Sequence, residues 1–157
     1  MGYQAGYSNT TGLYLTAFGA GALHSSNGDE NSAFGINTLY YNTSGGYNSA
    51  FGSQSLILNT TGNNNSAFGY KALYSNTTAS ANTAVGYQAG YSNTTGSPNT
   101  FIGQQAGYNV TTGSDNIGIG FRSLGYAAAL TGSNNVSVGD FAAYYTQGSA
   151  ANNTAIG

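Results

Sequence analysis

The 157-residue sequence contains no cysteine, no tryptophan, one proline and very few charged residues. Without cysteine, the chain has no disulfide framework and no thiolate zinc site. Lys71 and Arg122 are its only cations, so no basic patch exists that could neutralise a row of phosphates. This argues against nucleic acid and anionic membrane surfaces as partners. No apolar run is long enough for a transmembrane helix, and residues 1–9 lack the features of a signal peptide.

Charged residues make up 4% of the chain, against roughly 25% in ordinary soluble domains. A disordered chain stays solvated through high net charge and few aromatic residues. This chain has a formal net charge of −2 and 13% aromatic residues, together with 25 glycines. We therefore expect an ordered protein, with residues 1–157 forming a single repeat domain.

An apolar residue followed by glycine recurs every 16–19 residues along the chain, and the eleven residues 2–12 are identical to residues 86–96. These pairs delimit nine units with no segment left over. They are Met1-Gly2, Phe18-Gly19, Phe34-Gly35, Phe51-Gly52, Phe68-Gly69, Val85-Gly86, Ile102-Gly103, Ile119-Gly120, Val138-Gly139 and Ile156-Gly157. Such regularity indicates that equivalent positions share one environment.

Three further columns follow the same period. Four residues before the glycine stands asparagine, except at Leu15: Asn31, Asn48, Asn65, Asn82, Asn99, Asn116, Asn135 and Asn153. Three residues after it stands a small residue: Ala5, Ala22, Thr38, Ser55, Ala72, Ala89, Ala106, Ser123 and Ala142. Two residues further on stands tyrosine, at Tyr7, Tyr40, Tyr74, Tyr91, Tyr108 and Tyr144, replaced elsewhere by His24, Ile57 and Gly125.

A period of about 17 residues is too short for a helical hairpin, and the glycines with β-branched and aromatic neighbours favour strands. We predict an all-β parallel β-solenoid, or β-roll, of nine coils without caps. Each coil is expected to hold one strand ending at the glycine, a second strand after it, and a closing turn. Coils stacked about 4.8 Å apart would make a rod of roughly 43 Å.

The apolar residue before each glycine is expected to form a continuous buried stripe. The strand that contains this residue varies little in residue type on either face: one face carries Phe, Val or Ile and the other mostly Ala, as in the segment Ser66–Gly69. A single thin roll would expose one of these faces. We therefore expect several chains around a shared axis, with three the favoured number. The asparagine column would pass amide hydrogen bonds from coil to coil, and the tyrosine rings would stack.

The units at 82–96, 99–113 and 153–157 resemble the head repeats of trimeric autotransporter adhesins. They are still more similar to repeats of phage tail-fibre and related surface-fibre proteins, and the resemblance covers essentially the whole chain. It implies a left-handed parallel β-roll with three chains side by side. It also implies an extracellular, cell-surface or virion location, as a rigid stalk or adhesive head.

The titratable residues offer no active site. His24 occupies the tyrosine column, where we expect a surface ring. Asp29 and Glu30 are adjacent in a turn, and a metal ion would need more oxygen ligands. Asp115 and Asp140 lie in different coils at different repeat positions, so they form no acid–base pair. We predict no enzyme, no catalytic or metal site and no cofactor.

Two other patterns have a simple interpretation. The glycine-rich segment Gly118–Gly125 has the composition of a nucleotide loop, but it is in register with the strand column and no helix is expected after it. Sequons such as Asn9-Thr10-Thr11 and Asn93-Thr94-Thr95 follow from composition alone, so glycosylation depends on the compartment.

The sequence favours a structural fibre protein that associates side by side with copies of itself, and end-to-end stacking into filaments is a further hypothesis. Two alternatives stay open. A receptor- or glycan-binding adhesin or tail-fibre segment could use the tyrosine column to stack on sugar rings. An ice-binding solenoid could use the threonine pairs of the closing turns, although these lie where the repeat length varies.

Overall fold

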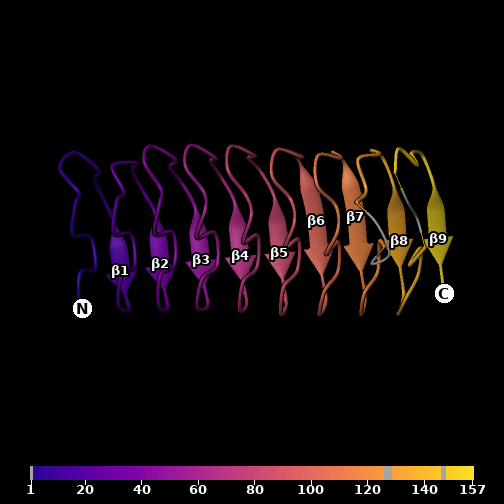
Figure 1. Ribbon diagram of the computed structural model, residues 1–157, viewed down its shortest axis with the longest axis horizontal. Coiled ribbons are helices and arrows are strands. Elements are labelled where there is room, and N and C mark those ends of the chain that lie inside the picture. The colour runs from indigo at the N-terminus through magenta and orange to yellow at the C-terminus, as the bar shows by residue number, and fades with distance from the viewer. Residues whose placement is uncertain (1, 126–128, 146–147) are drawn as a thin grey trace.

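The computed structural model describes residues 2–125, 129–145 and 148–157, and the regular secondary structure in these residues is entirely β-strand. Each coil contributes one short strand to a single parallel sheet in chain order. The strands are β1 (Thr16–Phe18), β2 (Ser32–Phe34), β3 (Ser49–Phe51), β4 (Ser66–Phe68), β5 (Thr83–Val85), β6 (Asn99–Ile102), β7 (Asn116–Ile119), β8 (Val136–Val138) and β9 (Thr154–Ile156). Figure 1 shows the coils side by side along a straight rod. The predicted parallel β-solenoid is confirmed.

The register between neighbouring strands matches the repeat. Ala33 pairs with Ala50 and Phe34 pairs with Phe51, and the same positions stay aligned along the rod. The glycine after each of β1 to β8 has a φ between 121° and 142°, a conformation that side chains rarely adopt. Among the described residues, none belongs to a helix that could cross a bilayer.

The predicted second strand of each coil is wrong. Residues two and four after the glycine have positive φ, as at Lys71 (55°) and Leu73 (50°), so the segment winds through successive turns. Its backbone nevertheless joins the coils. The Lys71 N–H donates to the carbonyl of Ser53 in the preceding coil, and the Leu73 N–H donates to the carbonyl of Ala89 in the following coil.

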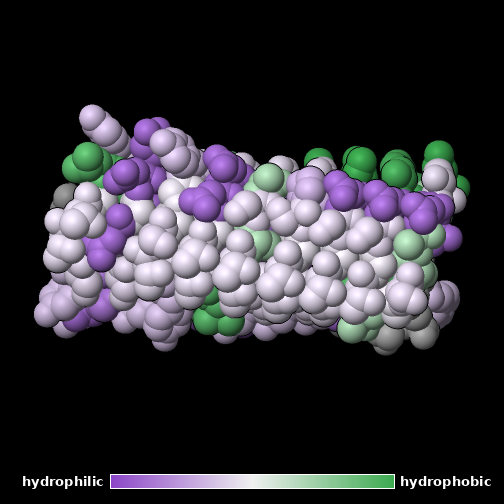
Figure 2. Space-filling view, turned by 90° about the horizontal axis from the view of Figure 1, so that it is seen from above, coloured by the Kyte–Doolittle hydropathy of each residue, from purple (hydrophilic) through white to green (hydrophobic). Residues whose placement is uncertain are grey.

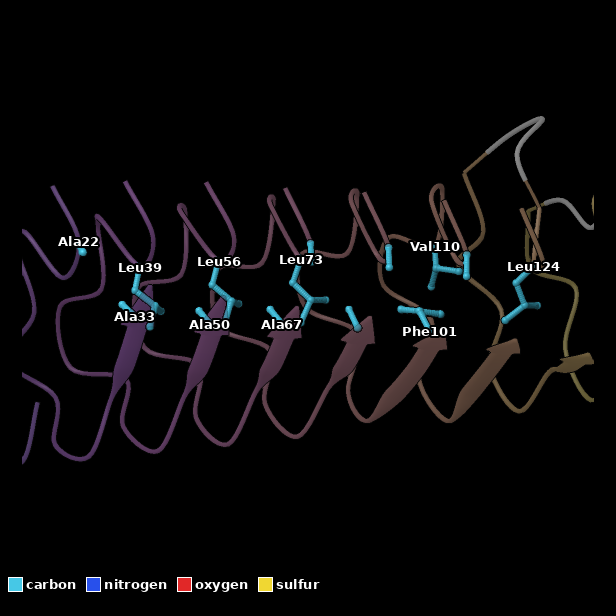
Figure 3. Close-up of a cluster of buried hydrophobic side chains, with 14 of the residues drawn as sticks. Ala22, Ala33, Leu39, Ala50, Leu56, Ala67, Leu73, Phe101, Val110 and Leu124 are labelled. Atoms are coloured by element: carbon cyan, nitrogen blue, oxygen red, sulfur yellow. The ribbon is translucent and has the colours of Figure 1, made fainter. Parts of the chain in front are cut away.

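The core is a narrow column inside the coils. The middle residue of each strand points inward, and a leucine from the turn segment lies beside it, as with Ala33 and Leu39 in Figure 3. Ala50 and Leu56 repeat the arrangement, and all four side chains are fully buried. Eight of the nine small residues predicted after the glycine are also buried: Ala22, Thr38, Ser55, Ala72, Ala89, Ala106, Ser123 and Ala142.

Phe101 fills the core differently from the alanines of the other strands. Its ring occupies the space that leucines fill elsewhere, and the corresponding turn positions are Gly90 and Gly107. A Cβ at Gly90 would lie 2.8 Å from Phe101 Cδ2, and one at Gly107 would overlap the ring. In this part of the rod, the large core side chain comes from the strand rather than from the turn segment, and the core stays filled.

The apolar residue before each glycine is not buried in the single chain, contrary to the expected buried stripe. Successive strand residues face opposite sides of the sheet, and the inward position belongs to the preceding residue. Beside Leu73, for example, Ala67 fills the interior, while Phe68 points outward and is 39% exposed. Within one chain, only the inner face of the sheet is therefore covered by other residues of the coil. Its outer face is open to solvent or to a partner.

Candidate functional site

The outer face of the sheet carries a line of exposed apolar side chains, which we call the outer stripe. It consists of Phe18, Phe34, Phe51, Phe68, Val85, Ile102, Ile119, Val138 and Ile156. All except Phe34 and Phe51 are between 36% and 79% exposed. The four phenylalanine rings stack on one another, with centroids 4.7 Å apart for Phe34 and Phe51. Figure 2 shows strongly hydrophobic side chains lined up along one edge over the C-terminal half of the rod.

A second outward column lies beside the outer stripe, two residues earlier in each strand. It carries hydroxyl side chains in seven strands: Thr16, Ser32, Ser49, Ser66, Thr83, Thr100 and Thr154. Ile117 and Val136 replace them in β7 and β8. No charged residue occupies either column.

The asparagine column forms a buried hydrogen-bond ladder. The backbone N–H and Nδ2 of Asn65 both donate to Asn48 Oδ1, at 2.9 and 3.1 Å, and its Nδ2 also donates to the Ala79 carbonyl at 2.9 Å. Each asparagine is bonded to the next in this way from Asn31 to Asn82 and from Asn116 to Asn153, whereas Asn116 is bonded to Asn99 through its backbone N–H alone. Between these runs the ladder is interrupted, because Asn82 Oδ1 has no partner in the described part of the chain.

A second asparagine ladder, not expected from the sequence, closes the coils. Asn59 Nδ2 donates to Asn42 Oδ1 at 2.8 Å, and Asn76 Nδ2 donates to Asn59 Oδ1 at the same distance. Asn93 continues the column, and all four side chains are fully buried. Their regular spacing in the sequence is a usable signal, although asparagine beside threonine and glycine is equally typical of polar turns.

We expect Asn65→Ala to lower the free energy of unfolding by about 1–3 kcal/mol, because it leaves the buried Asn82 N–H without its acceptor and removes the two bonds that Asn65 Nδ2 donates. Urea denaturation followed by circular dichroism would measure the loss. The control is Asn64→Ala, an exposed neighbour in a column where Ala81 adopts the same φ of 58°. Equal losses for the two variants would contradict a stabilising ladder.

The tyrosine column forms two main stacks. Tyr7, His24 and Tyr40 form the first, and Tyr74, Tyr91 and Tyr108 form the second, with centroids 5.0 Å apart and planes within 8°. Ile57 separates them, and Tyr144 instead makes edge contacts with Phe141 and Tyr145. Within each stack the rings cover one another's faces. A sugar ring approaching from the side would meet ring edges and hydroxyl groups rather than a flat platform.

Lys71 lies against this aromatic surface. Its Nζ is 5.3 Å from the Tyr70 ring centroid and 5.2 Å from that of Tyr74. A hydrogen bond with Tyr70 raises the pKa of Lys71 above its ordinary value. The other cation, Arg122, donates through Nε to Gln105 Oε1 at 2.8 Å. Both cations therefore contact neighbouring side chains of the rod surface.

The acidic residues and the histidine are far from forming a catalytic cluster. His24 stacks between two tyrosines, and its Nδ1 is 3.0 Å from Ser25 Oγ. Asp29 Oδ1 accepts from the Leu13 N–H, and Asp140 Oδ1 accepts from the Phe121 N–H. In residues 2–125, 129–145 and 148–157, no three His, Cys, Asp or Glu side chains come together as a metal site. The absence of an enzyme activity stays a prediction.

The remaining sequence patterns occupy structural positions. Gly118 is the inward residue of β7, where a Cβ would lie 3.1 Å from Leu124 Cδ1. The sequon residue Asn93 is buried in the second ladder, whereas Asn9 is exposed. In the closing turns, Thr60 Oγ1 donates to the carbonyl of Thr77, and the bond recurs between later coils.

Searches with protein-family models, among curated proteins and among solved structures found no match for this chain.

Proposed function

We propose that this chain is a structural, non-enzymatic rod that associates side by side with copies of itself through the outer stripe. The observation that carries the proposal is the stripe itself, nine apolar side chains in one line along the outer face of the sheet. Parallel sheets occur almost only where both faces are covered. Here one face is covered by the chain's own turns, and a partner is needed for the other.

The geometry of the stripe favours a second copy as that partner. A protein that covers the stripe must offer apolar side chains at one-coil spacing along the whole rod. A second copy of this chain has the same spacing, because it has the same coils. The adjoining hydroxyl column has no charge, so the side chains of this column in like copies meet without repulsion. Exposed apolar surface of this extent is typical of association sites.

Three copies around a common axis, with left-handed coils, is the arrangement that the resemblance to surface-fibre repeats implies, and it belongs to the proposal. So does an extracellular, cell-surface or virion location. End-to-end stacking is a further part of it, because coils of one repeat present equivalent surfaces to one another along the rod. Electron microscopy at high protein concentration would show filaments, whereas short discrete particles alone would contradict the stacking.

The mass in solution tests lateral association. We expect sedimentation equilibrium to give three times the chain mass of 15.9 kDa, and the double variant Phe51→Ser, Ile102→Ser to shift the protein at least tenfold toward the monomer. Both side chains point away from the core, so folding should persist. Tyr47→Asn is the matched control, since Tyr47 is 57% exposed and lies outside the stripe. A wild-type protein that stays monomeric at all concentrations would overturn the proposal.

The two alternative functions have direct tests. A glycan array would detect receptor binding, and Tyr91→Ala should abolish it if the tyrosine stack forms the site. Thermal hysteresis would detect ice binding by the threonine turns. A positive result in either assay with a monomeric protein would replace the structural proposal.

A further inference from the structure

Identical coils create a problem for lateral association. If every coil presented the same two side chains, a copy shifted by one coil, about 4.8 Å, would bury almost the same surface as the aligned one. Register between strands is weakly specified wherever the pattern does not distinguish one position from the next. A rod that associates in a defined way therefore needs a place where its outer face departs from the repeat.

The outer face departs from the repeat at β7 and β8. In these two strands the hydroxyl column carries Ile117 and Val136, which pair side by side, next to Ile119 and Val138 of the outer stripe. We call these four residues the aliphatic patch. Ile117 is 39% exposed and Val136 is half-buried. This is the one place in the nine strands where both outward columns are aliphatic, and it lies in the hydrophobic half of the edge seen in Figure 2.

A hollow adjoins the patch. It has a volume of about 310 Å³ and is lined by Pro98, Thr100, Asp115 and Ile117, with Asn99 and Asn116. A side chain from a facing surface has room to enter it beside Ile117. The departure from the repeat therefore involves shape as well as polarity.

We infer that the aliphatic patch sets the axial register and the parallel orientation of associated copies by packing against the same patch of a second copy. The inference rests on the proposed lateral association. In the aligned parallel arrangement, aliphatic groups meet aliphatic groups and hydroxyl groups meet hydroxyl groups. A shift by two coils would place Ile117 of one copy opposite Thr83 of the other, so a buried hydroxyl would lose its partner.

The antiparallel arrangement is less favourable for the same reason. Two fully overlapping antiparallel rods would set Ile117 against Ser49 and Val136 against Ser32. An antiparallel pair that kept patch against patch would overlap only around β6 to β9, and it would leave the phenylalanines of the outer stripe uncovered. Only the parallel aligned arrangement packs the patch against itself, sets hydroxyl groups against hydroxyl groups and covers the whole outer stripe.

Cysteine cross-linking tests the register, since the chain has no cysteine of its own. Ser32→Cys and Ser66→Cys place a thiol in the same outward column two coils apart, roughly 10 Å, beyond the reach of a disulfide. The two variants are refolded together, one of them isotope-labelled, and oxidised. Mass spectrometry then counts disulfides between like positions (32–32, 66–66) and unlike positions (32–66).

With the patch intact, we expect like-position disulfides to exceed unlike ones by roughly tenfold or more, given two mismatched contacts in the shifted arrangement. Adding Ile117→Thr and Val136→Thr should bring the ratio close to one. Both positions carry Ser or Thr in the other seven strands, so the fold should tolerate the change. Ile36→Thr is the control, because Ile36 is 56% exposed and lies outside both outward columns, so this similar substitution should keep the like-position preference.

The outcomes separate the inference from the proposed function. A monomeric wild-type protein overturns lateral association itself. An associated protein that forms no like-position disulfide, or one whose like-position preference survives the two threonine substitutions, overturns the role of the patch alone. Loss of the preference in the double variant, with the associated mass retained, supports both.

Discussion

Replacing Gly69 by valine is expected to lower the free energy of unfolding by more than about 4 kcal/mol and to abolish assembly. Gly69 has a φ of 142°, which strains any residue with a side chain. A Cβ at this position would also overlap the carbonyl group of Gly86 in the next coil. Because the neighbouring coils are held by the same stacking, the damage spreads beyond the substituted coil.

Denaturant unfolding and the sedimenting mass of Gly69→Val would measure this loss. Gly6→Leu provides the control, because a Cβ at Gly6 has open space around it and the same turn position is leucine in Leu23 and Leu39. We expect this control to change the free energy of unfolding by less than about 1 kcal/mol. A fully stable, assembled Gly69→Val protein would show that the glycine column does not lie at the contact between coils.

The second large effect concerns how core volume is divided between Phe101 in the strand and the glycines at the turn positions. Phe101→Ala should lower the free energy of unfolding by about 3–5 kcal/mol, because it empties a fully buried ring site. Gly107→Leu should destabilise by about 1–3 kcal/mol or more, because its side chain would overlap the same ring. The double variant reproduces the alanine–leucine pair of the Ala67 and Leu73 coil and should regain at least half of the summed loss.

A double-mutant cycle measured by urea denaturation decides this point. Compensation requires the two losses to be strongly non-additive, with the double variant more stable than the sum of the single variants predicts. Simple additivity would mean that Phe101 and Gly107 do not share one space. The neighbouring Gly90, whose added Cβ would lie 2.8 Å from Phe101, then offers the alternative partner for the same cycle.

The sequence predicted the stacking correctly because each repeat position meets its own equivalents above and below. Ser49, Ala50 and Phe51 pair with Ser66, Ala67 and Phe68, as the spacing of the glycines requires. The asparagine column was also visible, since Asn occurs at one fixed distance from the glycine. The second ladder, at Asn42 and its equivalents, had the same spacing and was missed because its residues resemble ordinary turn residues.

Two features of the structure could not be predicted from the sequence. Positive φ at Lys71 and Leu73 turned the expected second strand into turns, and neither residue type signals that conformation. The inward face of the first strand was equally hidden, because alanine on one side and phenylalanine, valine or isoleucine on the other are all apolar. Each column alone is compatible with a buried position.

The period, the register and the all-β class can be predicted from the sequence, because these depend only on equivalent residues lying over one another. Which apolar column is inside depends on how the turns pack against the strand. Leucines such as Leu56 and Leu73, brought inward by the turns, leave space beside them for alanine but not for phenylalanine. The larger residues are therefore turned outward, and the outer stripe, with its proposed role in association, results from the limited width of the coil.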